Sequence, residues 1–301
     1  MLFAATLHSS NVAALTIDFD YRYDTSGFFT NISTGDAITE RRDALELAAS
    51  FYSGFTDQLT AISSGGSNSW SVDIFNPGLL GSSVTLVNEE IAADTIKIFV
   101  GGSSSAPGVL GFAGTGTVSA TGSSEFVDSV ITRGQNDGDY GIWGGSIWFN
   151  TNHDWYFDED SSGLISGLSD FLTTATHEIG HILGFGTADS WYDQIDNGYF
   201  MGENSVESYG GLVPVDRFGS HWAEGVTSVF DSILQETMMD PSTPSGTRQL
   251  PTELDYAGFS DIGWEVNNVS AVPLPAGIWL LFSGLSSFFY MRKQGQASSK
   301  T

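Results

Sequence analysis

The sequence predicts an α+β fold, with one large domain at about residues 15–266 and a short C-terminal tail. Three observations predict it. Several short runs alternate apolar and polar residues, as half-buried strands do. Two longer runs carry apolar residues at helical spacing, and the order along the chain is strand, helix, strands, helix, without an internal repeat. The 36 glycines, many of them beside serine, indicate many loops and few long helices.

The first half of the domain is predicted to contain one strand, one helix and three further strands. The first strand covers residues 15–23, where Leu15, Ile17, Phe19 and Tyr21 alternate with polar residues. An amphipathic helix is expected at residues 39–62, behind Thr39 as the N-cap. Its apolar face is Ala44, Leu45, Leu47, Ala48, Phe51, Phe55 and Leu59. A Ser/Gly-rich loop follows, and strands are then expected at residues 69–75, 82–87 and 95–100, the last of them central in the sheet.

The second half is organised around one apolar-periodic helix. Residues 101–124 are rich in Gly, Ser and Thr and are interpreted as a long surface excursion. A strand is predicted at residues 144–150, and a helix at residues 170–183 that ends at Gly184. The apolar side chains of that helix that are expected to face inward are Phe171, Leu172, Ala175, Ile179, Ile182 and Leu183.

Composition excludes several classes of partner and site. Ten Lys plus Arg against 36 Asp plus Glu give a net charge of -26, which argues against binding to nucleic acid or to an anionic membrane surface. Calcium is a more natural partner for such a chain. The absence of cysteine excludes both disulfides and a thiolate zinc site. The hydrophobic content of 41% is enough for a buried core in a chain of 301 residues.

The strongest chemical signal is the His-Glu-x-x-His motif at residues 177–181, inside the predicted helix at residues 170–183. Residues i and i+4 lie on one face of a helix, so His177 and His181 can bind a single Zn²⁺. Glu178 then lies beside the metal and can act as the general base toward a water whose pKa the metal has lowered. The rest of the chain has to supply a third ligand.

Two kinds of third ligand are open. His221 is the only histidine downstream of the motif, and it lies in a Gly-Ser-His-Trp-Ala-Glu segment. A carboxylate can take the same place, and Glu203 and Glu207 lie at a feasible distance along the chain. Position 187, where the short metzincin pattern has its third histidine, is Thr187.

A displaced third histidine followed by a turn containing Met resembles the leishmanolysin branch of the metzincins. The stretches that carry the resemblance are residues 177–186, 200–204 (Phe-Met-Gly-Glu-Asn), 209–211 (Tyr-Gly-Gly), 236–241 (Glu-Thr-Met-Met-Asp-Pro) and 261–264 (Asp-Ile-Gly-Trp), all within about residues 140–266. The resemblance implies a metzincin-like zincin domain, that is, a twisted mixed sheet plus an active-site helix. It also implies His177, His181 and His221 as ligands, Glu178 as the base, and a Met-turn at Met238 or Met239, of which we prefer Met239. Because leishmanolysin itself is rich in cysteine and this chain has none, any latency must work differently.

The functional hypothesis from the sequence is a zinc-dependent endopeptidase. By similarity to metzincins, the strand at residues 144–150 is expected to pair with an extended substrate. A second hypothesis is a matrix or surface protein whose zinc is structural or whose site is degenerate, and a third is a zinc hydrolase acting on a non-peptide amide. Calcium is a further cofactor to consider, because oxygen-rich loops can hold it, although such loops are more often solvated surface. The aspartates that suggest it are Asp137, Asp139, Asp154, Asp158 and Asp160.

Both ends of the chain carry possible targeting signals. Residues 1–14 read as a truncated secretion signal or as an ordinary N-terminal segment. In the tail at residues 267–301, a Val-Pro-Leu-Pro-Ala sequence precedes an apolar run at residues 277–291 and a basic end. The run is just long enough to cross a membrane with its C-terminus in the cytoplasm, and a buried helix is the alternative. The tail resembles PEP-CTERM sorting tails, which implies a single transmembrane helix, processing by an exosortase, and export to the cell surface or matrix of a Gram-negative bacterium.

Overall fold

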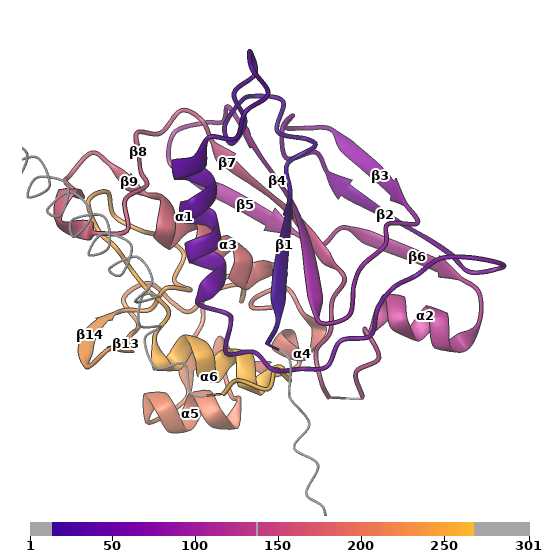
Figure 1. Ribbon diagram of the computed structural model, residues 1–301. Helices are drawn as coiled ribbons and strands as arrows, with labels where there is room; N and C mark the ends of the chain where they lie inside the picture. The colour runs from indigo at the N-terminus through magenta and orange to yellow at the C-terminus, as the bar shows by residue number, and fades with distance from the viewer. Residues whose placement is uncertain (1–13, 137, 268–301) are drawn as a thin grey trace, which may run out of the picture. The chain divides into compact units, whose positions relative to one another are not determined.

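The computed structural model describes residues 14–136 and 138–267, to which the following account is confined (Figure 1). These residues belong to one compact unit, Met1–Val269. Helices and strands are mixed along it, which confirms the α+β class. The helices are α1 (Thr39–Ser50), α2 (Ser124–Ile131), α3 (Phe171–Ile182), α4 (Asp189–Tyr192), α5 (Glu203–Tyr209) and α6 (Glu253–Asp261), with a 3-10 turn at Ser161–Gly163. The longer strands are β1 (Thr16–Asp20), β2 (Ser69–Phe75), β3 (Ser83–Val87), β4 (Thr95–Ser103), β5 (Gly111–Gly114), β6 (Thr117–Thr121), β7 (Gly144–Asn150), β13 (Thr227–Phe230) and β14 (Ile233–Glu236). The two-residue strands are β8 (Trp155–Tyr156), β9 (Ser169–Asp170), β10 (Ile195–Asp196), β11 (Tyr199–Phe200) and β12 (Val213–Pro214).

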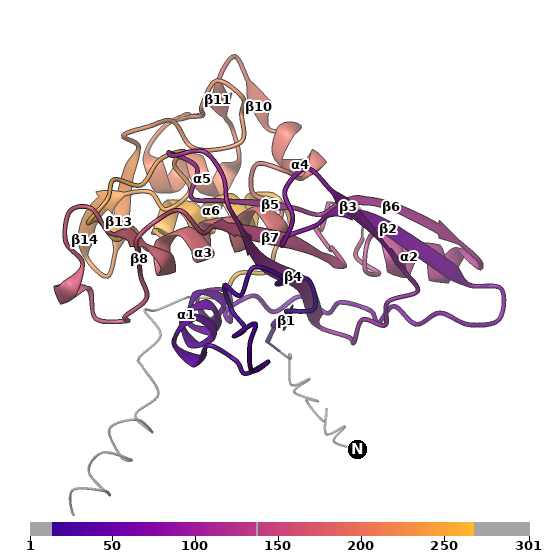
Figure 2. The same cartoon turned by 90° about the horizontal axis from the view of Figure 1, so that it is seen from above.

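The main sheet has the strand order β1-β4-β7-β5. Strand β4 pairs in parallel with both β1 and β7, whereas β5 runs antiparallel to β7. The predicted strands of the first half are confirmed, and β4 is central, as expected. A second sheet, β3-β2-β6, is antiparallel throughout. Figures 1 and 2 show α1 and α3 side by side next to the main sheet, and α2 beside the second sheet.

The predicted strand at residues 144–150 is present as β7, but its expected role in substrate pairing is wrong. All seven of its residues are buried. Its backbone bonds to β4 on one side and to β5 on the other, so it has no free edge for another strand. The edge of the sheet on this side is β5.

The interpretation of residues 101–124 as a surface excursion is also wrong. Strand β4 continues to Ser103, and the segment then supplies both β5 and β6. Glycine and serine weaken the sequence signal for a strand. Here, pairing with β7 and β2 provides the order that the local sequence does not.

The first helix is shorter than predicted, because α1 ends at Ser50 and not at residue 62. Phe55 and Leu59, which continue its apolar pattern, are still buried, but they lie outside the helix. Phe55 forms a bridge with Val266, and the Thr56 N–H bonds to the Glu265 carbonyl. Thr39 is the first helical residue and not the cap, since Ile38 occupies the cap position without a side-chain bond.

Helix α3 agrees with the prediction and lies in the main core. Its expected inward-facing residues are all buried, together with apolar residues of α1, β4 and β7. Ten of its twelve residues are buried, and the two partly exposed ones are His177 and His181. The helix is therefore fixed on nearly all sides and presents its histidines on the one open face. A second, smaller core lies between the β3-β2-β6 sheet, α2 and Phe99 of β4.

The predictions for the two chain ends fall almost entirely outside the described residues. These are the signal segment at residues 1–14 and the tail at residues 267–301, with its apolar run at residues 277–291. Among the helices within residues 14–267, none has the length and apolar character needed to cross a membrane.

Candidate metal centre

Helix α3 places two of the predicted ligands by its own geometry. Asp170 caps its N-terminus, and the carboxylate accepts hydrogen bonds from the Thr173 N–H at 3.2 Å and the Thr173 hydroxyl at 2.6 Å. At the other end the chain leaves the helix at Gly184, whose φ of +98° suits glycine. His177 and His181 lie one turn apart between these two ends. Their rings therefore point to the same side.

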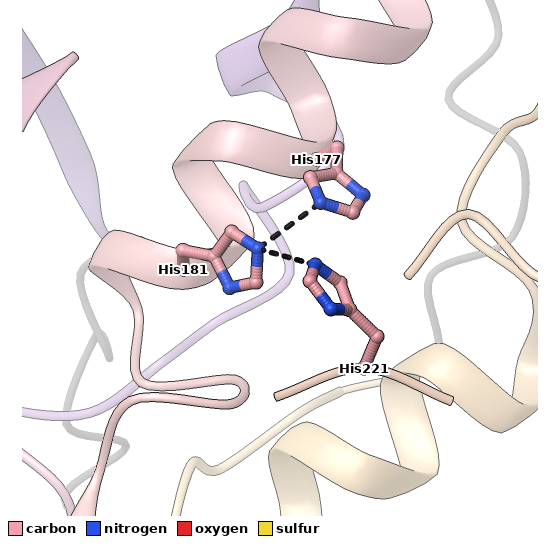
Figure 3. Close-up of side chains that lie close together, drawn as sticks. All are labelled: His177, His181 and His221. Carbon is pink, nitrogen blue, oxygen red and sulfur yellow. Dashed lines mark hydrogen bonds between the residues drawn. The ribbon is translucent and has the colours of Figure 1, made fainter. Parts of the chain in front are cut away.

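The third histidine comes from a segment far along the chain. His221 is followed by Trp222, which is fully buried, pairs with Val215 and donates its backbone N–H to the Met239 carbonyl at 3.0 Å. This anchoring brings the His221 ring to the open face of α3. The His181 Nε2 lies 3.0 Å from the Nε2 of His177 and 3.1 Å from the Nε2 of His221, and Figure 3 shows the three rings converging.

The remaining ring nitrogens show that these contacts are not ordinary hydrogen bonds. The Nδ1 of His177 lies 2.9 Å from the Met238 carbonyl oxygen, and that of His181 lies 2.8 Å from the Phe185 carbonyl oxygen. A carbonyl only accepts, so both Nδ1 atoms carry the proton and both Nε2 atoms present lone pairs. The Nδ1 of His221 faces the Asp216 carboxylate at 3.3 Å. Three lone pairs directed at one point repel one another unless a cation lies between them, and this arrangement is typical of a zinc ligand set.

The electrostatics of the site keep the imidazoles neutral. Burial, followed by the neighbouring histidine, lowers the pKa of His177 to about 3. Burial and His221 lower the pKa of His181 to about 4, and burial and His177 lower that of His221 to about 4. Neutral imidazole is the form that binds a metal. At neutral pH the three rings are therefore ready to bind without losing a proton.

Glu178 lies beside the histidines in the same cleft. Its side chain is buried, and burial raises the pKa of the carboxyl to about 8 in the protein without metal. A Cβ added to Gly111 of β5 would lie only 3.1 Å from both Cγ and Oε1 of Glu178. The edge strand thus touches the carboxylate, and it can do so because position 111 has no side chain. A carboxyl with a pKa near neutrality is suited to accept and return a proton.

The two methionines of the predicted Met-turn have different contacts. Both side chains are fully buried. Met239 lies under α3, with its sulfur 2.8 Å from where a Cβ on Gly180 would be. Met238 contributes its carbonyl to His177, as described above. The packing role expected of a Met-turn therefore falls to Met239, and the ligand-orienting role to the backbone of Met238.

Asp255 holds this turn in place, and the sequence reasoning missed it. Its buried carboxylate accepts the backbone N–H of Met238 at 3.0 Å, that of Met239 at 3.2 Å and the Trp222 indole N–H at 3.2 Å. It also closes a capping box with Thr252 at the start of α6. The Thr-x-x-Asp spacing at residues 252–255 is a signal in the sequence for the cap, but not for the bonds to the turn. Asp216 was missed as well, and only its proximity to His221 in the sequence could have indicated it.

The other predicted ligands lie elsewhere. Glu203 and Glu207 are exposed on α5, which packs against α6, and neither belongs to the histidine group. Thr187 lies near the site but donates its hydroxyl to the His181 carbonyl. Within the described residues the loop aspartates form no group that could hold a metal, and Asp137 lies outside them. The described members, all exposed, are Asp139, Asp154, Asp158 and Asp160.

The histidines and Glu178 line a cleft of about 720 Å³. Residues 108–113, which include most of β5, and residues 240–243, which follow Met239, also line this cleft. Such a cleft can hold an extended chain next to the metal centre. A scan against models of protein families matches none to this chain, and a search of curated proteins finds no similar sequence. The geometry and chemistry of this cleft therefore indicate the function.

Proposed function

We propose that the protein is a zinc-dependent endopeptidase. The observation that carries the proposal is the convergence of the three Nε2 atoms of His177, His181 and His221, each ring anchored through Nδ1, beside the Glu178 carboxylate. This donor set fits Zn²⁺, which is bound by neutral imidazoles and in catalytic sites has three protein ligands. When bound, zinc would lower the pKa of a water and polarise the carbonyl of the scissile bond.

The residues of the chain supply the proton transfer. Glu178 takes a proton from the attacking water and later gives it to the leaving amine. Its side chain is buried in the cleft, and the absence of a side chain at Gly111 leaves the space that the carboxylate occupies. Peptide hydrolysis by this route needs neither a nucleophilic side chain nor an organic cofactor.

The substrate would bind along β5. This strand is at the edge of the main sheet and its residues line the cleft beside Glu178. An extended peptide can add to such an edge through backbone hydrogen bonds, which suits a protein substrate better than a small amide. Strand β5 thus takes the role that the sequence had suggested for residues 144–150.

The resemblance of the motifs to the leishmanolysin branch of the metzincins supports the same function. We propose a metzincin-like arrangement, with Met239 as the Met-turn residue. The sorting tail at residues 267–301 would add export, transient anchoring by its apolar run and handling by an exosortase. The protein would then act at the cell surface or in the extracellular matrix.

A structural zinc site in a matrix protein is the alternative. Structural zinc normally has four protein ligands. Among the described residues the histidine group has three members, and the adjacent carboxylate points into a cleft. Both features favour an open, catalytic site.

Casein hydrolysis by the purified chain tests the proposal. We expect hydrolysis that a chelator abolishes and that stoichiometric Zn²⁺ restores, with one zinc per chain by elemental analysis. A zinc-loaded chain that cleaves neither casein nor gelatin would contradict the peptidase assignment.

A further inference from the structure

A second group of side chains that could hold a metal ion lies close to the histidines along the chain. One carboxylate oxygen from each of Glu224, Glu236 and Asp240 lies within 4.8 Å of the other two. We call these three residues the acidic cluster. Glu224 follows His221 by three positions, Glu236 ends β14, and Asp240 directly follows Met239. The cluster therefore joins the segments that fix two of the imidazoles.

Asp240 is the member of the cluster whose hydrogen-bonding capacity is not satisfied by its surroundings. The residue is 1% exposed. The Oδ1 accepts the Ser242 N–H at 3.0 Å, but no donor group among the described residues reaches the buried Oδ2, whose carboxyl instead lies against that of Glu236. A buried carboxylate oxygen without a partner is costly, and native proteins seldom leave one. The unpartnered oxygen belongs to the carboxylate that completes the acidic cluster.

The other contacts of the cluster do not balance its charge. The Ser242 hydroxyl lies 2.8 Å from both oxygens of Glu224, and the Gln249 amide donates to the Oε2 of Glu236 at 3.2 Å. All of these donors are neutral. None of the ion pairs formed within residues 14–136 and 138–267 includes a member of the cluster. Burial raises the pKa of Asp240, and so do the charges of Glu236 and Glu224 and a close carboxyl contact with Glu236, whereas the Ser242 N–H lowers it.

We propose that the acidic cluster binds a Ca²⁺ ion. The available donors are carboxylate and hydroxyl oxygens, which hard cations prefer, and no imidazole or thiolate belongs to the group. Calcium accepts irregular sets of six to eight oxygens from loops and waters, whereas Mg²⁺ demands a regular octahedron at shorter distances. Two of the three carboxylates lie in turns and the third at a strand end, a setting that suits the more adaptable ion.

The acidic cluster lies between segments that carry or orient the histidines, and this position indicates that the ion has a stabilising role. The acidic cluster spans the open end of the β13-β14 hairpin, where the Thr237 N–H bonds to the Val226 carbonyl at 2.9 Å. Glu224 lies three residues after His221. Glu236 and Asp240 lie before and after the turn at Met238 and Met239, and the Met238 carbonyl orients His177. A divalent ion at the cluster ties these segments together. It stabilises the scaffold of the histidine centre without entering its chemistry, so it does not depend on the peptidase proposal.

Thermal unfolding of the full chain, loaded with zinc and freed of calcium, tests the inference. With 1 mM CaCl₂ the unmodified chain is expected to unfold at a temperature about 5 °C higher or more, because a ligand at many times its Kd stabilises only the folded state. Glu236→Gln and Asp240→Asn are expected to lose this rise. In calcium-free buffer the same two variants should unfold at the same temperature as the unmodified chain or a higher one, because one of three acidic groups that oppose one another's ionisation is gone.

Matched variants distinguish the loss of a cluster carboxylate from the loss of a negative charge elsewhere on the protein. Glu207→Gln removes one exposed carboxylate from α5 and should keep the full calcium response. Glu224→Gln, at the exposed edge of the cluster, should reduce the response even if Asp240→Asn fails to fold. The inference is overturned if calcium leaves the unmodified chain unchanged, if the cluster variants keep the rise, or if Mg²⁺ produces an equal rise.

Discussion

The sulfur of Met239 lies under α3 at the one helical position that has no side chain, Gly180. A Cβ at position 180 would lie 2.8 Å from that sulfur and 3.0 Å from the Tyr52 hydroxyl oxygen. Tyr52 itself is fixed, because its hydroxyl donates to the Thr176 carbonyl at 2.7 Å. The turn that packs against α3 at Gly180 is therefore the same turn whose Met238 carbonyl orients His177.

Gly180→Ala is expected to destabilise the protein despite the better helix propensity of alanine. The propensity gain is about 1 kcal/mol, whereas overpacking a buried contact costs about 1 to 3 kcal/mol. Denaturant unfolding should show a net loss, with reduced zinc affinity. In the Met239→Ala background the same change should cost much less, because its partner is gone. Equal costs in the two backgrounds would show that Met239 and Gly180 are not coupled.

Asp216→Asn is expected to weaken zinc binding by about 10- to 100-fold, as loss of a partner of a ligating histidine commonly does. Asp216 is the only one of the three Nδ1 partners that is a side chain, since the others are backbone carbonyls. Competition with a chromophoric chelator measures the affinity. Asp193→Asn, which removes an exposed carboxylate after α4, is the control. An unchanged affinity in Asp216→Asn would remove Asp216 from the metal centre.

Gly111→Ala is expected to lower kcat by about tenfold while zinc content is unchanged, because the new Cβ crowds Glu178 and small displacements of a catalytic group are costly. Gly114→Ala on the same strand is the matched control. Its Cβ would be no closer than 3.4 Å to any neighbour, and that neighbour is Phe75. Steady-state kinetics with one peptide substrate measures kcat for both variants. Equal rates for the two variants would mean that β5 does not constrain the base.

The buried Glu178 carboxyl predicts a pH dependence of stability in the zinc-free protein. Its pKa is raised from 4.5 to about 8, so the folded state holds a proton that the unfolded state releases. The stabilisation from that proton is fully present below pH 4.5 and is lost as pH rises through about 8. Glu178→Gln should therefore become more stable than the unmodified chain with rising pH, by about 1.4 kcal/mol per unit over this range. Urea unfolding at several pH values in chelator measures it, and a difference that is constant with pH would refute it.

The features of the fold and the site that could be predicted from the sequence are those set by residues close together in the chain. The periodicity, cap and terminal glycine of α3 are all local, so the helix and the placement of His177, Glu178 and His181 on it could be read directly. His221 could be named only as the one histidine downstream of the motif and from the resemblance, with Glu203 and Glu207 left open, because a contact across forty positions leaves no periodic trace. Strands β5 and β6 were missed because glycine and serine dominate a segment whose order comes from β7 and β2.

The acidic cluster and the role of Asp255 could not be predicted either, because both depend on contacts between separate segments of the chain. The β13-β14 hairpin separates Glu224 from Glu236 and Asp240 along the chain, and nothing in the spacing of the three residues suggests that they meet. Asp255 serves a turn that is sixteen and seventeen positions earlier in the chain. The aspartates that do cluster in sequence, at residues 137–160, form no group that could hold a metal in the part of the fold that the structure describes.

The most direct test of the central claim is casein hydrolysis by Glu178→Ala, with the zinc content measured on the same sample. Alanine removes the base and leaves all three imidazoles and their Nδ1 partners in place. We expect one zinc per chain, as in the unmodified protein, and a loss of hydrolysis to background. A zinc-loaded Glu178→Ala chain that hydrolyses casein at the unmodified rate would contradict the account.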